Sequence, residues 1–222
     1  MASFELFILD YNYSSWSMRA GVLLRFAGVE FKETRLHLDT AGRAQLQQIS
    51  PSGLLPMLIH DGLRVWDSLA IAEYLAEQFP ELGIWPRDPA ARAHARSASA
   101  EMHSGFATMR MTMGMNIRAH YPGFPRTPEA DRNVRRVQAL WQELREHHGQ
   151  GGPYLCGAFG AVDAMFAPVL MRLRTYDVKL TGICADYAAA LEAHPAVQGW
   201  LAKAREDTFR IPDYDLIVDS PA

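Results

Sequence analysis

The sequence has little cysteine, no long apolar run and no dominant charge. Its 222 residues include only two cysteines, Cys156 and Cys184, which form neither a disulfide framework nor a Cys-x-x-Cys motif. Such sparse usage is typical of a reducing cytoplasmic compartment. No apolar stretch approaches the roughly 18 residues that span a bilayer, and Glu5 lies where a signal peptide carries positive charge. The sequence therefore predicts a cytoplasmic protein without a membrane-spanning or exported segment.

The charge balance also excludes classes of partner. Lys and Arg total 22 against 25 Asp and Glu, a net charge of −3, which argues against a protein that coats nucleic-acid phosphates. The histidines are scattered and form no ligand set at metal spacing, so no metal site is expected. With 49% hydrophobic and 10% aromatic residues, the chain is globular in composition. We expect its partners to be small molecules or proteins, with no nucleic acid and no membrane.

The first 80 residues alternate strand and helix signals. Residues 4–9 read FELFIL, long enough for a buried strand and too short for a helix. A helical pattern follows and ends at Gly28, and residues 34–38 alternate as a second strand does. Two further strand-like runs flank Asp61-Gly62, a strong hairpin signal, before a helix that Pro80 ends. The order predicts an α/β unit with a small mixed sheet.

The remainder of the chain has a different pattern. Residues 81–88 carry prolines and a glycine without periodicity and are interpreted as a linker. Asp88-Pro89 opens a helix predicted to run about 30 residues, to Arg118, and Thr127-Pro128 opens another that ends near Gly149. Further helices are expected over 162–176, 184–193 and 196–206. The predicted domains are therefore 1–80, a linker at 81–88, and an all-helical domain over 89–222.

Four short motifs, in order along the chain, carry a family resemblance. They are YSSWSMR at 13–19, SPSGLLP at 50–56, DSLAI at 67–71, and HPAV at 194–197 followed by Trp200. Together with the α/β-then-helical order, they resemble the serine-type glutathione S-transferases, especially the zeta and tau classes and their bacterial relatives. The resemblance implies a thioredoxin-like amino-terminal domain with a mixed four-stranded sheet, followed by an all-α bundle.

The resemblance implies that Ser14 is the catalytic residue. A free thiol has a pKa of about 8.5 and attacks well only as thiolate. A hydroxyl just before a helix can donate to the glutathione sulfur while the helix N-terminus adds positive potential. Such a bond contributes about 1.5–3 kcal/mol, enough to lower a thiol pKa by about one to two units. A plain helix cap is the other reading of Ser14, and Ser15, Ser17 and Tyr13 remain alternatives for the activating hydroxyl.

The other glutathione contacts are also implied by the resemblance. The Leu55–Pro56 bond is expected to be cis, which turns the Leu55 backbone toward the cysteinyl part of glutathione. Asp67 and Ser68 begin a helix and are expected to hold the γ-glutamyl group, although a helix cap alone explains both. The resulting glutathione-binding set is Ser14, Ser15, Leu55, Pro56, Asp67 and Ser68.

The chain departs from the family pattern at three places. Gly53 and Leu54 occupy the stretch where a lysine commonly pairs with the glycyl carboxylate. Either Arg43 or His37 supplies the cation instead, or the affinity for glutathione is expected to be low. Trp16 falls where zeta relatives often carry cysteine, which disfavours chemistry that needs that thiol. Gly160 stands where the family has the hydroxyl residue of a helix-capping element. The replacement is expected to lower the stability of the fold by only about a few tenths of a kcal/mol.

The predicted function is that of a glutathione transferase, a transferase of alkyl or aryl groups in detoxification. Glutathione is the co-substrate, without a metal, and the chain is expected to act as a homodimer. An apolar helix face is the expected pocket for a small hydrophobic electrophile, with core packing as the competing reading; it comprises Met102, Phe106, Met109 and Met113. The alternatives are a glutathione-dependent cis-trans isomerase, like maleylacetoacetate isomerase, and a non-catalytic glutathione-binding or regulatory family member.

Overall fold

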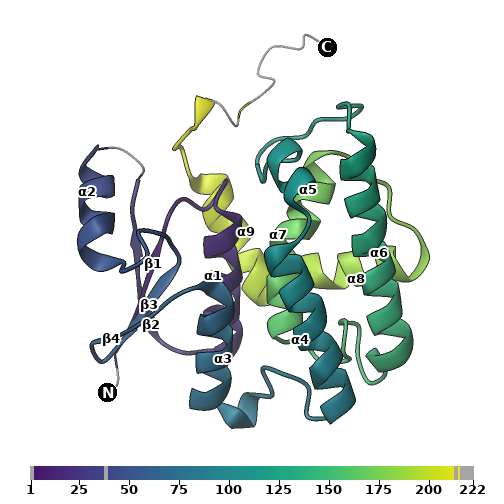
Figure 1. The fold of residues 1–222 in the computed structure, drawn as a ribbon, viewed down its shortest axis with the longest axis horizontal. Coiled ribbons are helices and arrows are strands. Elements are labelled where there is room, and N and C mark those ends of the chain that lie inside the picture. The colour runs from purple at the N-terminus through teal and green to yellow at the C-terminus, as the bar shows by residue number, and fades with distance from the viewer. Residues whose placement is uncertain (1–2, 38–39, 213–214, 216–222) are drawn as a thin grey trace.

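The computed structural model describes residues 3–37, 40–212 and 215, and its amino-terminal unit is built on four strands (Figure 1). These are β1 (Phe4–Ile8), β2 (Phe31–Arg35), β3 (Met57–His60) and β4 (Leu63–Val65), in the order β2-β1-β3-β4. β1 pairs parallel to β2, while β3 is antiparallel to both β1 and β4. The predicted mixed four-stranded sheet is confirmed.

Three helices cover this sheet. α1 (Ser15–Ala27) and α3 (Ser68–Gln78) lie on one face and α2 (Thr40–Ile49) on the other (Figure 1). α1 ends at Gly28, whose φ of 67° is the left-handed conformation that glycine favours, as the sequence predicts. α2 was not predicted from the sequence. Its Leu46 and Ile49 pack against a small apolar cluster on the second face of the sheet.

A short 3₁₀ turn, η1 (Pro80–Leu82), leads into the helical unit. The helices there are α4 (Pro89–Ser104), α5 (Ala107–Thr112), α6 (Pro128–His148), α7 (Ala161–Thr175), α8 (Gly182–Ala193) and α9 (Pro195–Glu206). Asp88 and Thr127 cap α4 and α6 with their side-chain oxygens, and each helix has proline in its first turn. Asp163 accepts from the backbone N–H of Gly160, so α7 keeps a cap despite the glycine.

The expectation of one helix from Asp88 to Arg118 is wrong. α4 ends at Ser104, and Phe106 adopts a φ of 57° before α5 begins. The Arg110 side chain folds back and donates to the carbonyls of Met102, at 2.8 Å, and His103, at 2.9 Å. These bonds satisfy carbonyls that the end of α4 leaves unpaired, which stabilises the break.

Helix α1 joins the two units. It packs against α3 on the sheet side and against α7 and α9 of the helical unit, and apolar side chains from both units form one continuous core. At Gly21 the approach to α9 is so close that a Cβ atom would lie 2.3 Å from Trp200 Cζ3. Only glycine fits there without displacing the tryptophan.

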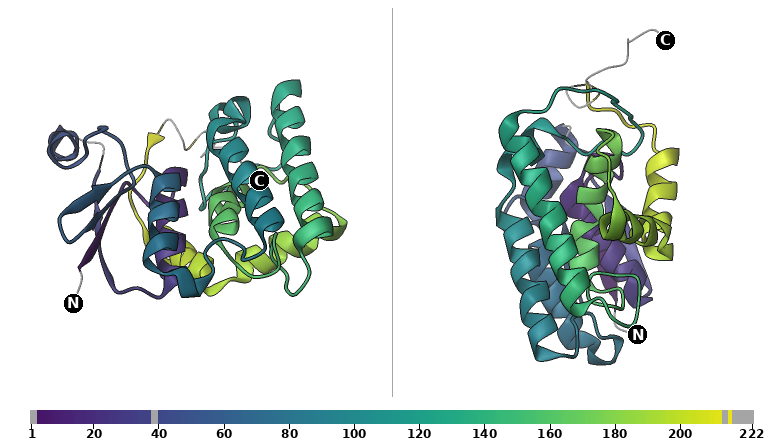
Figure 2. Two further views of the ribbon diagram at one scale, coloured as in Figure 1. Left: turned by 60° about the horizontal axis from the view of Figure 1, so that its bottom comes forward. Right: turned by 90° about the vertical axis from the view of Figure 1, so that its right-hand side faces the viewer.

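The chain after α9 returns to the amino-terminal unit (Figure 2). Asp207 forms an ion pair of 2.8 Å with Arg35 of β2, and Arg118 Nη2 donates to the Phe209 carbonyl at 2.6 Å. The segment thereby runs beside the carboxyl end of β1, where the candidate site lies.

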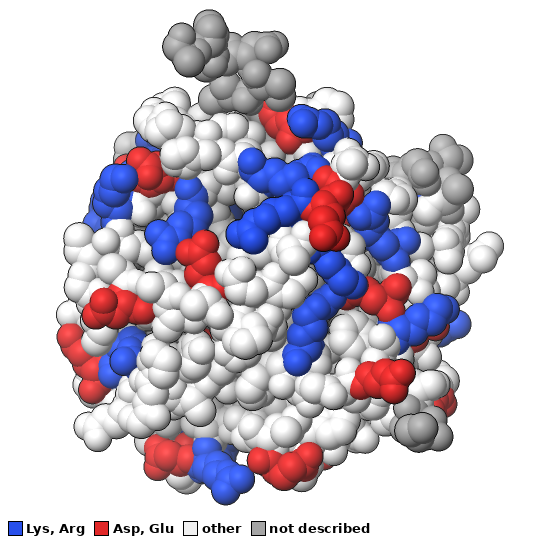
Figure 3. Space-filling view, turned by 180° about the vertical axis from the view of Figure 1, so that it is seen from behind, with Lys and Arg blue, Asp and Glu red and all other residues white. Residues whose placement is uncertain are grey.

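The surface is mixed in charge. On the face seen in Figure 3, basic and acidic side chains lie beside one another, and neither sign covers the whole face. Among the described residues, no helix combines the length and the apolar character needed to cross a membrane.

Candidate active site

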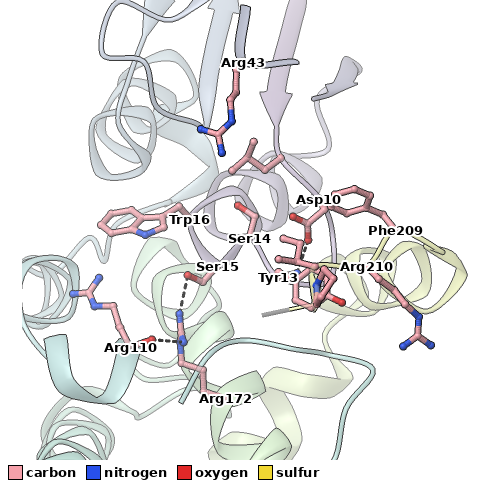
Figure 4. Close-up of a pocket in the computed structure, with 13 residues that line it drawn as sticks. Asp10, Tyr13, Ser14, Ser15, Trp16, Arg43, Arg110, Arg172, Phe209 and Arg210 are labelled. Atoms are coloured by element: carbon pink, nitrogen blue, oxygen red, sulfur yellow. Dashed lines mark hydrogen bonds between the residues drawn. The ribbon is translucent and has the colours of Figure 1, made fainter. Parts of the chain in front are cut away.

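A cavity of about 570 Å³ opens where the amino-terminal unit, the helical unit and the returning carboxyl-terminal segment meet (Figure 4). Its volume lies in the range usual for small-molecule sites. Residues from four parts of the chain line it: Leu9, Asp10, Tyr13, Ser14, Ser15 and Trp16; Arg43; Arg110 and Arg172; and Phe209, Arg210, Ile211 and Pro212.

Ser14 lies at the inner end of this cavity as the N-cap of α1. Its Oγ accepts from the Ser17 backbone N–H at 3.4 Å and donates to Ser17 Oγ at 2.8 Å. Ser17 is buried, and its Oγ also accepts from the Leu9 N–H at 3.1 Å. Ser17 therefore joins β1 to α1, while Ser14 presents a hydroxyl at the helix N-terminus, where backbone dipoles favour a negative charge.

The other two candidate hydroxyls have different partners. Ser15 Oγ accepts from Arg172 Nη2 at 3.0 Å. Tyr13 donates its hydroxyl to Asp215 Oδ1 at 2.7 Å and accepts from Arg118 Nη2 at 3.3 Å. Burial is the main cause that raises the pKa of Tyr13, and Asp215 raises it further, so the phenol stays protonated. Of these three hydroxyls, that of Ser14 is the one whose bonds, among the described residues, stay within its own helical turn.

Asp10 shapes the turn that carries Ser14. This buried carboxylate lines the cavity and accepts the Tyr13 backbone N–H at 2.5 Å. Burial raises its pKa, the nearby Asp207 adds to that effect, and the backbone donors oppose it. Sequence reasoning missed Asp10, although an Asp in the short loop between a strand and a helix is a recognisable turn signal.

Asp67 and Ser68 lie at the start of α3. Asp67 Oδ1 accepts from the backbone N–H groups of Leu69, at 2.9 Å, and Ala70, at 3.3 Å. Ser68 is buried, and its Oγ accepts from Arg19 Nη1 at 3.4 Å. Since Arg19 belongs to α1, one helix links the Ser14 end of the site to the α3 N-terminus.

The Leu55–Pro56 peptide bond is cis, as the resemblance implies. Leu55 and Pro56 are buried at the start of β3, whereas the Leu54 side chain is 70% exposed. The structure gives the two candidate cations different surroundings. Arg43 extends from α2 toward the cavity (Figure 4), while His37 Nε2 lies 3.2 Å from Arg35 Nη2 and its ring packs 4.6 Å from that of Phe209.

Two arginines that sequence reasoning did not single out also line the cavity. Arg172 comes from α7, and its guanidinium reaches Ser15 and the carbonyls of Arg110 and Met113. Arg110 comes from α5, and burial lowers its pKa. The one available signal was an arginine that follows the long apolar run of residues 164–171 on α7, because buried arginines are rare without a specific partner.

The proposed electrophile face lies elsewhere. Met102, Phe106, Met109 and Met113 are buried in the core, and none of them lines the 570 Å³ cavity. Met102, Phe106 and Met109 instead line a much smaller hollow of about 10 Å³, which also borders Ser15 and Arg172. Within the described ranges, no group of three or more His, Cys, Asp or Glu side chains is arranged to hold a metal ion.

Two models of known protein families match this chain. The profile "Glutathione S-transferase, N-terminal domain" matches residues 5–77, and "Glutathione S-transferase, C-terminal domain" matches residues 127–203. The chain belongs to the glutathione S-transferase family. Both matched stretches contain motifs that carry the resemblance, and the sheet unit followed by helices is the fold of that family.

Individual relatives lie near two branches of the family. A probable maleylacetoacetate isomerase of Caenorhabditis elegans is 28% identical over 192 residues, covering 82% of this chain and 88% of the relative. Glutathione S-transferase 1 of Dianthus caryophyllus is 24% identical over 186 residues, covering 83% and 80%.

Solved structures give the same fold. A glutathione transferase homologue from a Burkholderia, with bound glutathione, superposes with a TM-score of 0.72 at 25% identity, covering 92% of this chain and all of the other. The tau class glutathione S-transferase of mango has a TM-score of 0.71 at 22% identity, covering 92% and 94%.

Proposed function

We propose that this glutathione S-transferase activates the thiol of glutathione with Ser14 and directs the thiolate onto a small electrophile in the adjoining cavity. The observation that carries the proposal is the position of Ser14, at the N-terminus of α1 and in the cavity wall. When the thiol ionises, its proton passes to solvent, and Ser14 turns its hydroxyl from Ser17 to the sulfur. The sulfur then forms the bond to the electrophile: an aryl halide releases its halide ion to solvent, and a conjugated acceptor takes up a proton from solvent at the carbon beside its carbonyl.

Glutathione fits along the edge that runs from Ser14 to the start of α3. In this proposal the Leu55 backbone pairs with the cysteinyl unit, with Pro56 next to it, and Ser15 supports the turn through Arg172. Asp67 and Ser68 hold the γ-glutamyl group at the α3 N-terminus, where N–H groups and the helix dipole attract its carboxylate. Arg43 takes the glycyl carboxylate, because Leu54 carries no charge and Arg43 extends into the cavity.

The isomerase alternative is favoured by Arg110 and Arg172. Two guanidinium groups in one cavity wall recognise carboxylates well, since arginine binds them with paired hydrogen bonds. An electrophile that carries carboxylates, including a maleyl-type isomerisation substrate, would place them there. Conjugation is ranked first because Trp16 occupies the position of the zeta-type cysteine. The non-catalytic alternative predicts binding of glutathione without turnover.

We propose a cytoplasmic homodimer as the working form. Leu63 and Trp66 expose apolar surface beside the edge strand β4, where a second copy would cover it. Light scattering at micromolar concentration tests this, and a monomer throughout that range would contradict it.

Two measurements test the main proposal. Purified protein should be retained by immobilised glutathione and should melt at a higher temperature in millimolar glutathione, because a ligand that binds only the folded state stabilises it. It should also conjugate an aryl halide. Absence of both glutathione effects would falsify the proposal, and binding without conjugation of any electrophile in a broad panel would favour the non-catalytic alternative.

A further inference from the structure

His103 lies near the end of α4 and contacts Asp67, the N-cap residue of α3. The proposed reaction of glutathione gives this histidine no role. Its Nε2 lies 3.0 Å from Asp67 Oδ2. On the other side of the ring, Nδ1 lies 3.5 Å from Arg19 Nη1. The ring also packs edge-on against Trp16, with centroids 5.0 Å apart and an interplanar angle of 88°.

These contacts define where the imidazole carries its proton. A guanidinium only donates hydrogen bonds, so Nδ1 of His103 accepts from Arg19. The ring proton then lies on Nε2, which donates to Asp67 Oδ2. A second proton on Nδ1 would face the positive Arg19, so the geometry favours a neutral ring. Burial is the largest cause that lowers the pKa of His103; Arg19 and Arg110 lower it further, and Asp67 opposes them.

Both oxygens of Asp67 are thereby oriented. Oδ1 accepts the N–H groups of Leu69 and Ala70, and Oδ2 accepts from His103. A carboxylate has about four lone-pair sites, so three bonds leave capacity for another donor. The Asp67 side chain is 49% exposed, which leaves it open to a ligand.

We propose that His103 is a positioning residue for glutathione: as a neutral hydrogen-bond donor it fixes Asp67 to receive the γ-glutamyl ammonium, without cancelling the charge of the carboxylate. The inference rests on the proposed function, because it needs glutathione at the start of α3. Through His103, helix α4 of the helical unit contributes to the binding of glutathione by the amino-terminal unit.

A neutral donor suits this role better than a charged one. An imidazolium would itself pair with Asp67 and compete with the ammonium of the ligand. Among the residues that the structure describes, four side chains face His103: Asp67 from the cap of α3, Arg19 and Trp16 from α1, and Arg110 from α5. Asp67 is the only acidic group among these four, so protonation of His103 would act mainly on Asp67.

The test compares two ligands by titration calorimetry. One is glutathione, and the other is its analogue in which hydrogen replaces the γ-glutamyl α-ammonium. His103→Ala should weaken glutathione binding about tenfold, the scale of one hydrogen bond to a charged group, and should leave binding of the analogue within about twofold. His103→Gln keeps an N–H donor and should restore most of the affinity for glutathione.

His94→Ala is the matched control, since His94 lies on the same helix but pairs with His148, at 2.8 Å. It should bind both ligands as the parent protein does. As pH falls below about 6.5, the ordinary pKa of histidine, the parent should lose affinity for glutathione more steeply than His103→Gln. This pH difference keeps the inference testable should His103→Ala fail to fold.

The outcomes separate the two proposals. If the parent protein binds glutathione but His103→Ala binds it equally well, or loses both ligands equally, the role of His103 is only structural and the inference is wrong. Equal pH dependence in the parent and in His103→Gln would also overturn it. If the parent does not bind glutathione at all, the proposed function fails, and this inference fails with it.

Discussion

Tyr13 donates its hydroxyl to Asp215, a residue 202 positions further along the chain, at 2.7 Å. Asn116 Nδ2 donates to the same carboxylate oxygen at 2.9 Å. The phenol that precedes Ser14 therefore holds the carboxyl-terminal segment against the cavity. This contact gives Tyr13 a role in shaping the cavity wall, which is compatible with the proposal that Ser14 activates the thiol.

Tyr13→Phe should loosen this wall without changing the chemistry of sulfur. The KM for the electrophile should rise severalfold, because Phe209 to Pro212 lose one of their anchors. The apparent pKa of bound glutathione, read from the pH profile of kcat/KM, should stay in place. An upward shift of that pKa by a full unit would instead make Tyr13 the activating residue.

Ser14→Ala should raise the pKa of the bound thiol. Loss of one donor to the thiolate corresponds to about one to two pKa units and to a fall in conjugation rate at neutral pH of about 10- to 100-fold. The sign follows from the bond, since Ser14 stabilises the charged form and its removal favours the thiol. Ser15→Ala is the matched comparison, and a larger effect there would transfer the role to Ser15.

Arg43→Gln should weaken glutathione binding by about two- to fivefold, the scale of one exposed charge pair with a ligand. The glycyl ethyl ester of glutathione lacks the carboxylate, so its affinity should change little. His37→Gln serves as the comparison, and a selective effect on free glutathione there would identify His37 as the cation.

Arg172→Gln should discriminate between electrophiles. With a maleyl-type dicarboxylate the KM should rise at least about tenfold, whereas with a neutral aryl halide the change should be much smaller. The ratio of the two effects is the useful quantity, because Arg172 also supports Ser15 and its loss disturbs both reactions. Equal effects on both substrates would remove the support for an anionic electrophile.

Trypsin cleavage after the exposed Arg87 should not separate the two halves of the chain under native conditions. α1 is packed against α7 and α9, and Arg35 pairs with Asp207 across the same boundary. Nicked protein should elute from a sizing column at the position of the intact protein and divide only in denaturant. Two independently eluting fragments would mean that the shared core contributes little.

Local signals account for the elements that the sequence predicts well. Gly28 ends α1, and Asp61 with Gly62 turns the hairpin with φ values of 47° and 88°, because those conformations depend on residues next to one another. The order of strands and helices then follows. α2 escaped prediction because its apolar positions, Leu46 and Ile49, have meaning only against the far face of the sheet.

Long-range contacts explain what the sequence could not predict. The break at Phe106 depends on Arg110 folding back to the end of α4, and the cavity depends on Arg172 and on Phe209 arriving from distant positions. No local pattern marks these residues as neighbours of Ser14. The four apolar residues that the sequence offered as a pocket are buried and lie outside the 570 Å³ cavity, and their role toward an electrophile stays a prediction.

The close contact between Gly21 and Trp200 makes the position of Ser14 sensitive to substitutions at position 21. Ser14 and Gly21 are seven residues apart, about two turns of the same helix. A side chain at position 21 would clash with Trp200, and if α1 rather than the tryptophan moves to relieve the clash, the serine moves with it. A substitution in the buried contact between α1 and α9, outside the cavity wall, would then be observed as a change in the acidity of glutathione.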